Sequence, residues 1–383
     1  MNRALKSSDN AVERRINVPL ARPDITDLER RYVMEVLGTP HLSLGPRLAE
    51  FEEKLAAYAG VKHAVAVNSG TSALHLIVRA LGISEGDEVI TTPFSFIASS
   101  NCILFERGRP VFVDIEPDTL NIDTALIAKA ITPRTKAILA VDVFGHPARW
   151  DKLERLAADH NLKLIEDSAE AIGSEFNGRR CGSFGDAAIF AFYPNKQITT
   201  GEGGVVLTDD DALAQLCYSL RNQGRAEGVE WLQHARLGYN YRLSDINCAL
   251  GLAQLERIEE IIRARADVAR LYDEQLSQID RLSVQHVAPG VKMSYFVYVV
   301  RLSDDYTRDD RDRIIRGLQD QGIGCGDYFT PIHLQPFYRE LGYREGAFPV
   351  TEAVAARTIA LPFFNRLSPA EIEYVVKQLK RLL

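Results

Sequence analysis

A lysine beside a buried segment is the first residue of this chain that points to chemistry. Lys196 comes shortly after the apolar run 186–192 and precedes three glycines, Gly201, Gly203 and Gly204. A lysine desolvated in such a place has a depressed pKa and forms Schiff bases with carbonyl compounds. Taken alone, a surface lysine ahead of a glycine-rich hairpin is the commoner interpretation.

Two carboxylates end another apolar run, 162–167. Because side chains alternate across a strand, Glu166 and Asp167 are expected to point to opposite faces, which excludes a paired acid and base. One carboxylate at a strand tip would suit a buried cationic partner. A solvated acidic strand end is the alternative.

A turn of small hydroxyl residues, 69–72 (SGTS), follows the apolar run His63–Asn68 and opens a helical pattern. Small residues, hydroxyls and the unpaired N–H groups of a helix start favour a phosphate, although Ser at a helix start is more often only an N-cap. The chain contains no G-x-x-x-x-G-K-[ST] motif and no G-x-G-x-x-G after a strand, which excludes the common nucleotide loops.

Pyridoxal phosphate requires all three of these features together. A phosphate anchor, an aspartate that keeps the pyridine nitrogen protonated and a lysine for the carbonyl carbon are the groups that this cofactor needs. The combination therefore predicts a pyridoxal phosphate site.

The elements that must position these residues alternate between short apolar runs and helical periodicity. This alternation predicts a mostly parallel sheet of seven strands, covered on both faces, with ligands beyond the carboxyl ends of the strands. The expected strands are 63–68, 87–91, 110–114, 136–142, 162–167, 186–192 and 204–208.

The pattern changes near Ser244, where one long amphipathic helix is expected to run through Leu271. A strand over 295–302 and helices over 308–321 and 368–383 follow. We therefore expect a large domain at 1–255 and a smaller C-terminal α/β domain at 256–383.

Composition narrows the class of protein. A chain of 383 residues suits two domains, and 46% hydrophobic with 25% charged residues is typical of a globular enzyme. The net charge of -7 argues against nucleic acid or membrane partners. Five scattered cysteines favour reduced thiols, and the absence of a histidine cluster favours no metal. No apolar leader or membrane span is visible, so a cytoplasmic protein is expected.

Four segments carry a specific resemblance. The chain resembles the DegT/DnrJ/EryC1/StrS family of pyridoxal-phosphate-dependent sugar aminotransferases from about Pro19 to its end, in the family's order and spacing. The segments are Asn68–Leu74 (NSGTSAL), Glu166–Gly173 (EDSAEAIG), Phe192–Gly204 (FYPNKQITTGEGG) and Gly238–Asp245 (GYNYRLSD). The resemblance implies a type I aminotransferase fold and a homodimer whose active sites lie at the subunit interface.

The resemblance also implies roles for single residues. Lys196 corresponds to the Schiff-base lysine, and Asp167 to the aspartate at the pyridine nitrogen. The other expected cofactor contacts are Gly70, Thr71 and Ser72 at the phosphate, Phe96 stacked on the ring, Glu170 near the ring hydroxyl, and Asn240, with Arg242 beside it, reaching the phosphate from the partner subunit.

Three further positions bear on the substrate and the reaction. His333 resembles a substrate-side histidine, although an isolated histidine is more often structural. Ala191 stands where many members have a serine, so one hydroxyl contact to the phosphate is missing or replaced. Lys196 is intact, whereas the family's dehydratase branch has histidine there, and this favours transamination.

The expected reaction moves an amino group from L-glutamate to a nucleotide-linked 4-keto-6-deoxy sugar. A keto-cyclitol or another unlinked keto compound is the alternative acceptor, because only a diphosphate needs positive charge in the acceptor pocket. The candidate cations for that role are Lys292, Arg225 and Arg236. A non-catalytic regulatory protein is a further alternative, against which the acidic balance and the complete catalytic set argue.

Overall fold

A seven-stranded sheet in the order β1-β9-β8-β5-β4-β2-β3 forms the centre of the computed structural model, which describes residues 17–225, 230 and 233–383. Only β9 runs antiparallel to its neighbours β1 and β8, and every other pair is parallel, which confirms the predicted mostly parallel sheet. The strands are β1 (His63–Val67), β2 (Glu88–Thr91), β3 (Arg109–Phe112), β4 (Thr135–Val141), β5 (Lys163–Asp167), β8 (Ala187–Ala191) and β9 (Gly204–Thr208).

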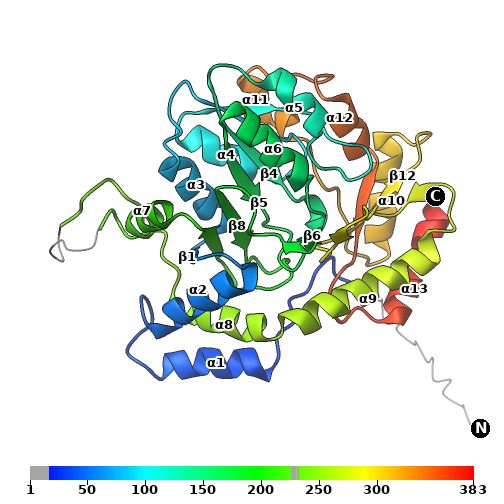
Figure 1. Cartoon of the computed structure of the whole chain (residues 1–383). Coiled ribbons are helices and arrows are strands. Elements are labelled where there is room, and N and C mark those ends of the chain that lie inside the picture. The colour runs from blue at the N-terminus through cyan, green and yellow to red at the C-terminus, as the bar shows by residue number, and fades with distance from the viewer. Residues whose placement is uncertain (1–16, 226–229, 231–232) are drawn as a thin grey trace, which may run out of the picture.

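Helices cover both faces of this sheet because its strands are apolar on both faces (Figure 1). Val65 and Val67 pack in one cluster with side chains of the helices that follow β1 and β9, whereas Ala64 and Ala66 pack in another. The first face is covered by α3 (Gly70–Ala80), α4 (Ala98–Phe105) and α7 (Asp211–Arg221). The second face is covered by α2 (Pro46–Ala59), α5 (Thr124–Ala130), α6 (Trp150–His160) and α8 (Asp245–Glu256).

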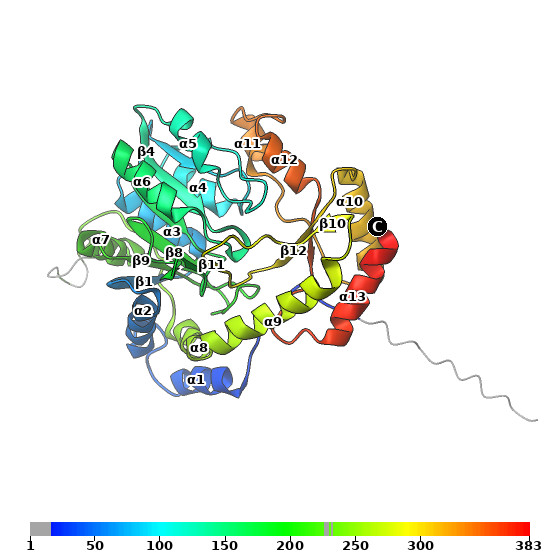
Figure 2. The same ribbon diagram turned by 45° about the vertical axis from the view of Figure 1, so that its right-hand side comes forward.

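The long helix expected after Ser244 is two helices, α8 and α9 (Ile258–Leu276), which meet at Arg257. The break has a physical reason, because the Arg257 guanidinium is tied to the N-terminal segment. It donates to Glu29 Oε1 at 2.8 Å and to Asp24 Oδ2 at 2.9 Å. Figure 2 shows α9 running from α8 beneath the central sheet to α13 at the far end of the molecule.

The first helix, α1 (Asp27–Leu37), lies against α8, and a residue of α8 links α1 to the loop that carries Lys196. Gln254 on α8 donates to Glu29 Oε1 at 2.7 Å, and its own Oε1 accepts from Thr199 N–H at 3.3 Å. Glu29 on α1 is thus two hydrogen bonds away from the lysine loop.

The C-terminal part is built on an antiparallel sheet of order β10-β12-β13. This C-terminal part combines a three-stranded sheet with helices and is smaller than the part built on the central sheet, which confirms the expected smaller α/β unit. The boundary at residue 255 stays a prediction. The strand expected over 295–302 begins at Tyr298. The elements are β10 (Leu282–Ser283), β12 (Tyr298–Leu302), β13 (Thr358–Leu361), α10 (Arg308–Asp320), α11 (Pro336–Glu340), α12 (Pro349–Ala355) and α13 (Pro369–Leu382).

Some short elements have no counterpart in the sequence analysis. A small antiparallel sheet of order β11-β6-β7 consists of two-residue strands, which are too short to show a period of two. These strands are β6 (Glu175–Phe176), β7 (Arg179–Arg180) and β11 (Val291–Lys292), and the 3₁₀ turns are η1 (Val143–Gly145) and η2 (Ile332–Leu334).

Within the described residues, no helix is both long and apolar enough to cross a bilayer. The segment 1–15, in which no leader was expected, lies outside the described residues.

Candidate active site

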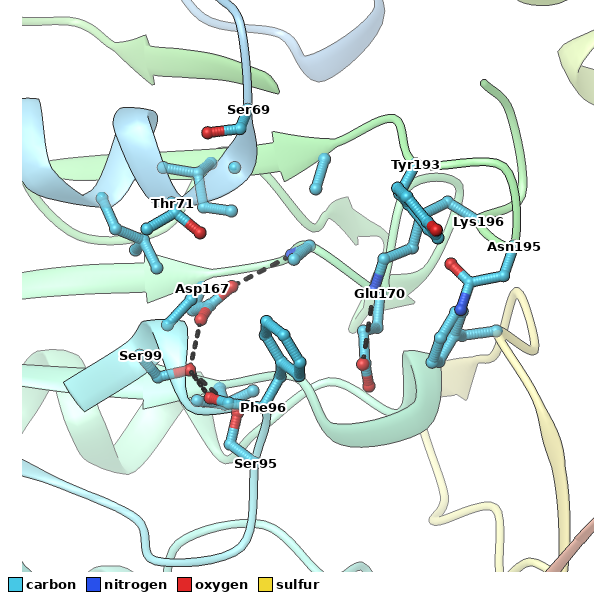
Figure 3. Close-up of a pocket in the computed structure, with 18 of the residues that line it drawn as sticks. Ser69, Thr71, Ser95, Phe96, Ser99, Asp167, Glu170, Tyr193, Asn195 and Lys196 are labelled. Carbon is cyan, nitrogen blue, oxygen red and sulfur yellow. Dashed lines mark hydrogen bonds and ion pairs between the residues drawn. The ribbon is translucent and has the colours of Figure 1, made fainter. Parts of the chain in front are cut away.

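A pocket of about 420 Å³ opens at the carboxyl edge of the parallel strands. Its wall comes from the start of α3, the turn before α4, the ends of β5 and β8, and the segment at residues 328–329 of the C-terminal part. Figure 3 shows Asp167 with Ser99 on one side of this space, Lys196 with Glu170 on the other, and the ring of Phe96 between them. The fold thus brings together residues from five separate regions of the chain.

Asp167 ends β5 and is buried, whereas its neighbour Glu166 points to the opposite face, as the alternation of side chains predicts. Asp167 Oδ2 accepts a hydrogen bond of 2.7 Å from Ser99 Oγ, and Ser99 lies 2.8 Å from Ser95 Oγ. Burial raises the pKa of Asp167, and the hydrogen bond from Ser99 is the largest effect that opposes this rise. The carboxylate is therefore held in place on the pocket floor.

Lys196 reaches the pocket from the loop after β8. Its Nζ lies 3.4 Å from Glu170 Oε1 and 3.9 Å from the centroid of the Phe296 ring, and its side chain is only 12% exposed. Glu170 is fixed in turn, because its Oε2 accepts from Phe144 N–H at 2.9 Å. Burial raises the pKa of Glu170, and the positive charge of Lys196 opposes that rise. The site thus holds one primary amine, oriented by a carboxylate and an aromatic face.

The start of α3 forms the wall where the hydroxyl-rich turn was expected to bind a phosphate. Ser69 is the N-cap, and its Oγ accepts from Ser72 N–H at 3.1 Å. The N–H groups of Gly70 and Thr71, in the first turn, have no intrahelical partner, and both residues line the pocket. Ser72 is buried and donates to Asn68 Oδ1 at 2.7 Å, so it belongs to the cap and does not line the pocket.

Gly70 and Ala191 approach each other closely at this wall. A Cβ atom on Gly70 would lie 2.7 Å from the Cβ of Ala191, which is closer than real Cβ atoms come. The position that holds a serine in many family members therefore packs directly against the start of α3. A larger residue at position 70 would therefore force the start of α3 away from β8.

The remaining cofactor candidates differ in their placement. Phe96 lines the mouth of the pocket and is 62% exposed. Asn240 is exposed, its backbone pairs with that of Asn222, and it does not line this chain's own pocket. Arg242 lies nearby and donates to Asn222 Oδ1 at 3.0 Å.

The substrate candidates lie outside the lining of this pocket. His333 is fully buried on η2, with Nε2 at 2.9 Å from Glu352 Oε1. Lys292 pairs with Glu175 at 2.9 Å, on the small β11-β6-β7 sheet. Arg225 and Arg236 lie on either side of the segment 226–232, most of which is outside the described residues, and neither lines the pocket.

Sequence reasoning missed several residues that line the pocket. Ser95, Ser99, Phe296, Tyr328 and Phe329 come from segments far apart in the chain and belong to none of the four quoted motifs, which hides them in the sequence. Tyr193 and Asn195 lie in the same quoted segment as Lys196, and this proximity was the available signal for them. The missed residues are Ser95, Ser99, Tyr193, Asn195, Phe296, Tyr328 and Phe329.

The residues of the pocket fit pyridoxal phosphate. The open N–H groups at the start of α3, with a glycine cradle that a Cβ would fill, suit a phosphate. The buried Asp167 suits a protonated ring nitrogen, and Lys196 supplies an amine for an aldehyde carbon. The described part of the pocket has no arginine, so the phosphate would meet neutral donors on this side.

One buried group, on the other face of β5, contains metal-ligand residue types: Asp142, Glu166 and Cys181. Its carboxylate oxygens are already occupied. Asp142 Oδ1 accepts from Trp150 Nε1–H at 2.9 Å, and Glu166 accepts from the N–H groups of Gly182 and Phe184. The group therefore offers no free set of metal ligands.

Comparisons with known proteins identify the family of the chain. The model of the DegT/DnrJ/EryC1/StrS aminotransferase family matches residues 23–380. GDP-perosamine synthase of Caulobacter vibrioides is 40% identical, over 96% of this chain and 98% of its own. The aminotransferase PseC of Helicobacter pylori, involved in pseudoaminic acid biosynthesis, superposes with a TM-score of 0.92 at 30% identity, over 96% of this chain and 99% of its own.

A putative sugar aminotransferase of Streptococcus pneumoniae, solved in its PLP form, superposes with a TM-score of 0.91 at 29% identity, over 96% of this chain and 98% of its own. The fold, the family match and these relatives agree on the cofactor and on the class of reaction. The chain therefore belongs to the DegT/DnrJ/EryC1/StrS aminotransferase family, whose members depend on pyridoxal phosphate.

Proposed function

We propose that this aminotransferase moves an amino group from L-glutamate to the keto group of a nucleotide-linked 4-keto-6-deoxy sugar. The observation that carries the proposal is the placement of Lys196 Nζ, 3.4 Å from Glu170 Oε1, in a pocket whose opposite side holds the buried Asp167. Relatives named for a GDP-linked amino sugar and for pseudoaminic acid biosynthesis support a sugar acceptor. The family resemblance supports the glutamate donor.

Each residue of the pocket has a role in this proposal. Lys196 Nζ holds the cofactor and, once released, moves a proton to or from the carbon that gains or loses the amino group. Asp167 keeps a proton on the ring nitrogen, and Glu170 orients Nζ. When bound, pyridoxal phosphate supplies the electron sink for the carbanion. Gly70 and Thr71 line the pocket and would bind its phosphate through their N–H groups, and Phe96 would stack on its ring.

We also propose that the active enzyme is a homodimer in which Asn240 reaches the partner's pocket. Asn240 is exposed, and the neighbouring tyrosines pack in a firm cluster that fixes its segment. His75 contacts Tyr239 at 4.7 Å and Phe105 at 5.1 Å between ring centroids, and the Phe105 ring is 52% exposed. The exposed Phe105 ring, which this cluster connects to the segment of Asn240, would be buried if a second copy covered this face.

The visible absorption spectrum of the purified enzyme tests the proposal. We expect a band from cofactor bound through Lys196 that collapses to the pyridoxamine phosphate form when L-glutamate is added. A GDP-linked 4-keto-6-deoxyhexose should then restore the band, whereas a keto-inositol should not. Restoration by the keto-inositol alone would favour the unlinked acceptor. A band that glutamate leaves unchanged would contradict the donor.

A further inference from the structure

Asn195, the residue before Lys196, has a buried polar atom that the proposed reaction has not used. Its side-chain Oδ1 is shielded from solvent and has no hydrogen-bond partner among the described residues, although Asn195 lines the pocket. A buried carbonyl oxygen without a partner costs free energy, so an atom of this kind that lines a binding pocket is suited to accept a hydrogen bond from a ligand. Figure 3 places the Asn195 amide at the same end of the pocket as Lys196 and Glu170.

The hydroxyl of Tyr328 lies beside this amide. Tyr328 comes from the C-terminal part and lines the same pocket, where the Asn195 amide is close enough to affect the pKa of the tyrosine hydroxyl. Burial and the charge of Glu170 raise the pKa of Tyr328, so its hydroxyl stays protonated. Because the Tyr328 side chain lines the pocket and its hydroxyl is protonated, the hydroxyl can donate this proton to a ligand.

The two side chains are held in position by their surroundings. The backbone carbonyl of Tyr328 accepts from Thr358 Oγ1 at 2.9 Å, and its ring packs on Phe296 and Phe144 at 6.1 and 6.2 Å between centroids. Lys196 N–H donates to the carbonyl of Tyr193 at 2.9 Å, which closes the turn that carries Asn195. One acceptor and one donor are thus presented together from opposite parts of the molecule.

The charges around this pair decide which ligand group it suits. A carboxylate or a phosphate placed here would meet the lone pairs of Asn195 Oδ1 and the carboxylate of Glu170. A hydroxyl group offers one proton and two lone pairs, and it can therefore donate to Asn195 Oδ1 while accepting from Tyr328. Of the two proposed substrates, only the sugar has a hydroxyl next to the reacting carbonyl carbon.

We propose that Asn195 and Tyr328 form a subsite for the hydroxyl group adjacent to the keto carbon of the acceptor. The subsite rests on the proposed function and deepens it, because it makes the acceptor a hydroxy-ketone and orients the keto carbon toward Lys196. It acts in the second half of the reaction alone, since glutamate has no such hydroxyl.

The experiment separates the two half-reactions of the holoenzyme. In the Tyr328→Phe and Asn195→Leu variants, conversion of bound pyridoxal phosphate by L-glutamate should keep its rate within about twofold of the unmodified enzyme. Single-turnover transfer from the pyridoxamine phosphate form to a GDP-linked 4-keto-6-deoxyhexose should slow by about tenfold to a hundredfold in kcat/KM. Tyr374→Phe, which removes a hydroxyl bonded to Gln321 at the surface, is the matched control and should leave both half-reactions unchanged.

A second acceptor makes the result specific. The 3-deoxy analogue of the same GDP-linked keto sugar lacks the hydroxyl, so the unmodified enzyme should use it about as poorly as Tyr328→Phe uses the parent sugar. Tyr328→Phe should then no longer distinguish the two sugars. Equal losses on both sugars, or a slowed glutamate half-reaction, would overturn the subsite. An unmodified enzyme that fails with glutamate and with both sugars would instead refute the proposed function.

Discussion

Ser99 donates a hydrogen bond of 2.7 Å to Asp167, and both side chains are buried. Ser99 has a single hydroxyl proton, so when that proton goes to Asp167 the Ser95 hydroxyl, 2.8 Å away, is the donor to Ser99. Two hydroxyls from the turn before α4 and its first residues thus point in series at the carboxylate of β5. The sequence predicted a role for Asp167 in the pocket but gave no signal for its partner Ser99.

Removing this hydroxyl should weaken the binding of the cofactor. Burial raises the pKa of Asp167, and Ser99→Ala removes the hydrogen bond that most opposes this rise. The pKa of the carboxyl therefore rises further, and a smaller fraction of it carries the negative charge that the ring nitrogen needs. We expect the dissociation constant of pyridoxal phosphate to rise about tenfold at pH 7, and by more as the pH falls toward 6. Titration of the apoenzyme followed by absorbance measures this.

Ser100→Ala is the matched control for that experiment. Ser100 is the next residue of α4, is equally buried, and bonds the Tyr338 hydroxyl at 2.6 Å instead of Asp167. Ser99→Thr keeps a hydroxyl and should retain the affinity. Equal dissociation constants for Ser99→Ala and Ser100→Ala across this pH range would show that the hydroxyl does not act through Asp167.

Loss of the lysine amine should abolish turnover without unfolding the protein. Lys196→Ala removes the primary amine of the pocket while leaving its surroundings, because the Lys196 side chain has one ion pair and one aromatic contact. Steady-state activity and the far-ultraviolet circular dichroism spectrum report the two effects separately. Lys163→Ala, which breaks a surface pair with Asp186, should keep full activity. Activity of Lys196→Ala near that of the unmodified enzyme would contradict the role of Lys196 as the catalytic amine.

Mixing two inactive variants tests whether the site is shared between subunits. We expect Asn240→Glu to be inactive, because its carboxylate would repel the phosphate in the partner's pocket. When Lys196→Ala and Asn240→Glu are refolded together in equal amounts, half of the dimers should be mixed, and each of these has one intact site. About a quarter of the normal activity should therefore return. No recovery in dimers that have demonstrably mixed would place both residues in the same subunit's site.

A buried pair of carboxyls on the other face of β5 should make stability depend on pH. Ser168 Oγ contacts both Asp142 Oδ2 and Glu166 Oε1, the latter at 2.6 Å, yet it has one proton. One contact therefore needs a proton on a carboxyl. Burial raises the pKa of Asp142 to about 6, and burial with the charge of Asp142 raises that of Glu166 well above its usual range.

The sign follows from these raised values. Between pH of about 4 and the folded pKa, the folded state binds more protons than the unfolded state. The contribution of these protonated carboxyls to the free energy of unfolding is therefore complete below that pH range and is lost as the pH rises through it. Asp142→Asn supplies a permanent N–H toward Ser168. The free energy of unfolding of this variant should therefore fall less steeply with rising pH, by up to about 1.4 kcal/mol per pH unit. Apparent melting temperatures of the apoenzyme from pH 4.5 to 8 test this. Parallel curves for the two proteins would contradict it.

Strands with period-two or continuous apolar runs were predictable because burial on both sheet faces demands them. The run 162–167, for example, differs from β5 by one residue. The end of α8 at Arg257 was not predictable, since apolar spacing continues across it and the break depends on Asp24 and Glu29, more than 220 residues earlier. Only the folded chain brings these partners together.

The residues of the candidate site also differ in how far the sequence predicts their positions. Lys196 and Asp167 follow strands that end at one edge of the sheet, so topology alone places them together. Ser72 shows the opposite case, because a hydroxyl near a helix start serves either a cap or a ligand, and here it donates to Asn68. Tyr328 belongs to a segment without periodicity, and its approach to Asn195 depends on how the C-terminal part packs.

The bond between Glu29 and Gln254 has a consequence for synthesis on the ribosome. The two residues are 225 positions apart, so at about 5–20 residues per second α1 emerges some ten to forty-five seconds before its partner helix exists. Its exposed side includes Met34 and Leu37, and the face meant for α8 is bare as well during that interval. We expect the nascent chain to bind chaperones through this first helix until α8 is made, which crosslinking of stalled ribosome complexes before and after residue 257 would reveal.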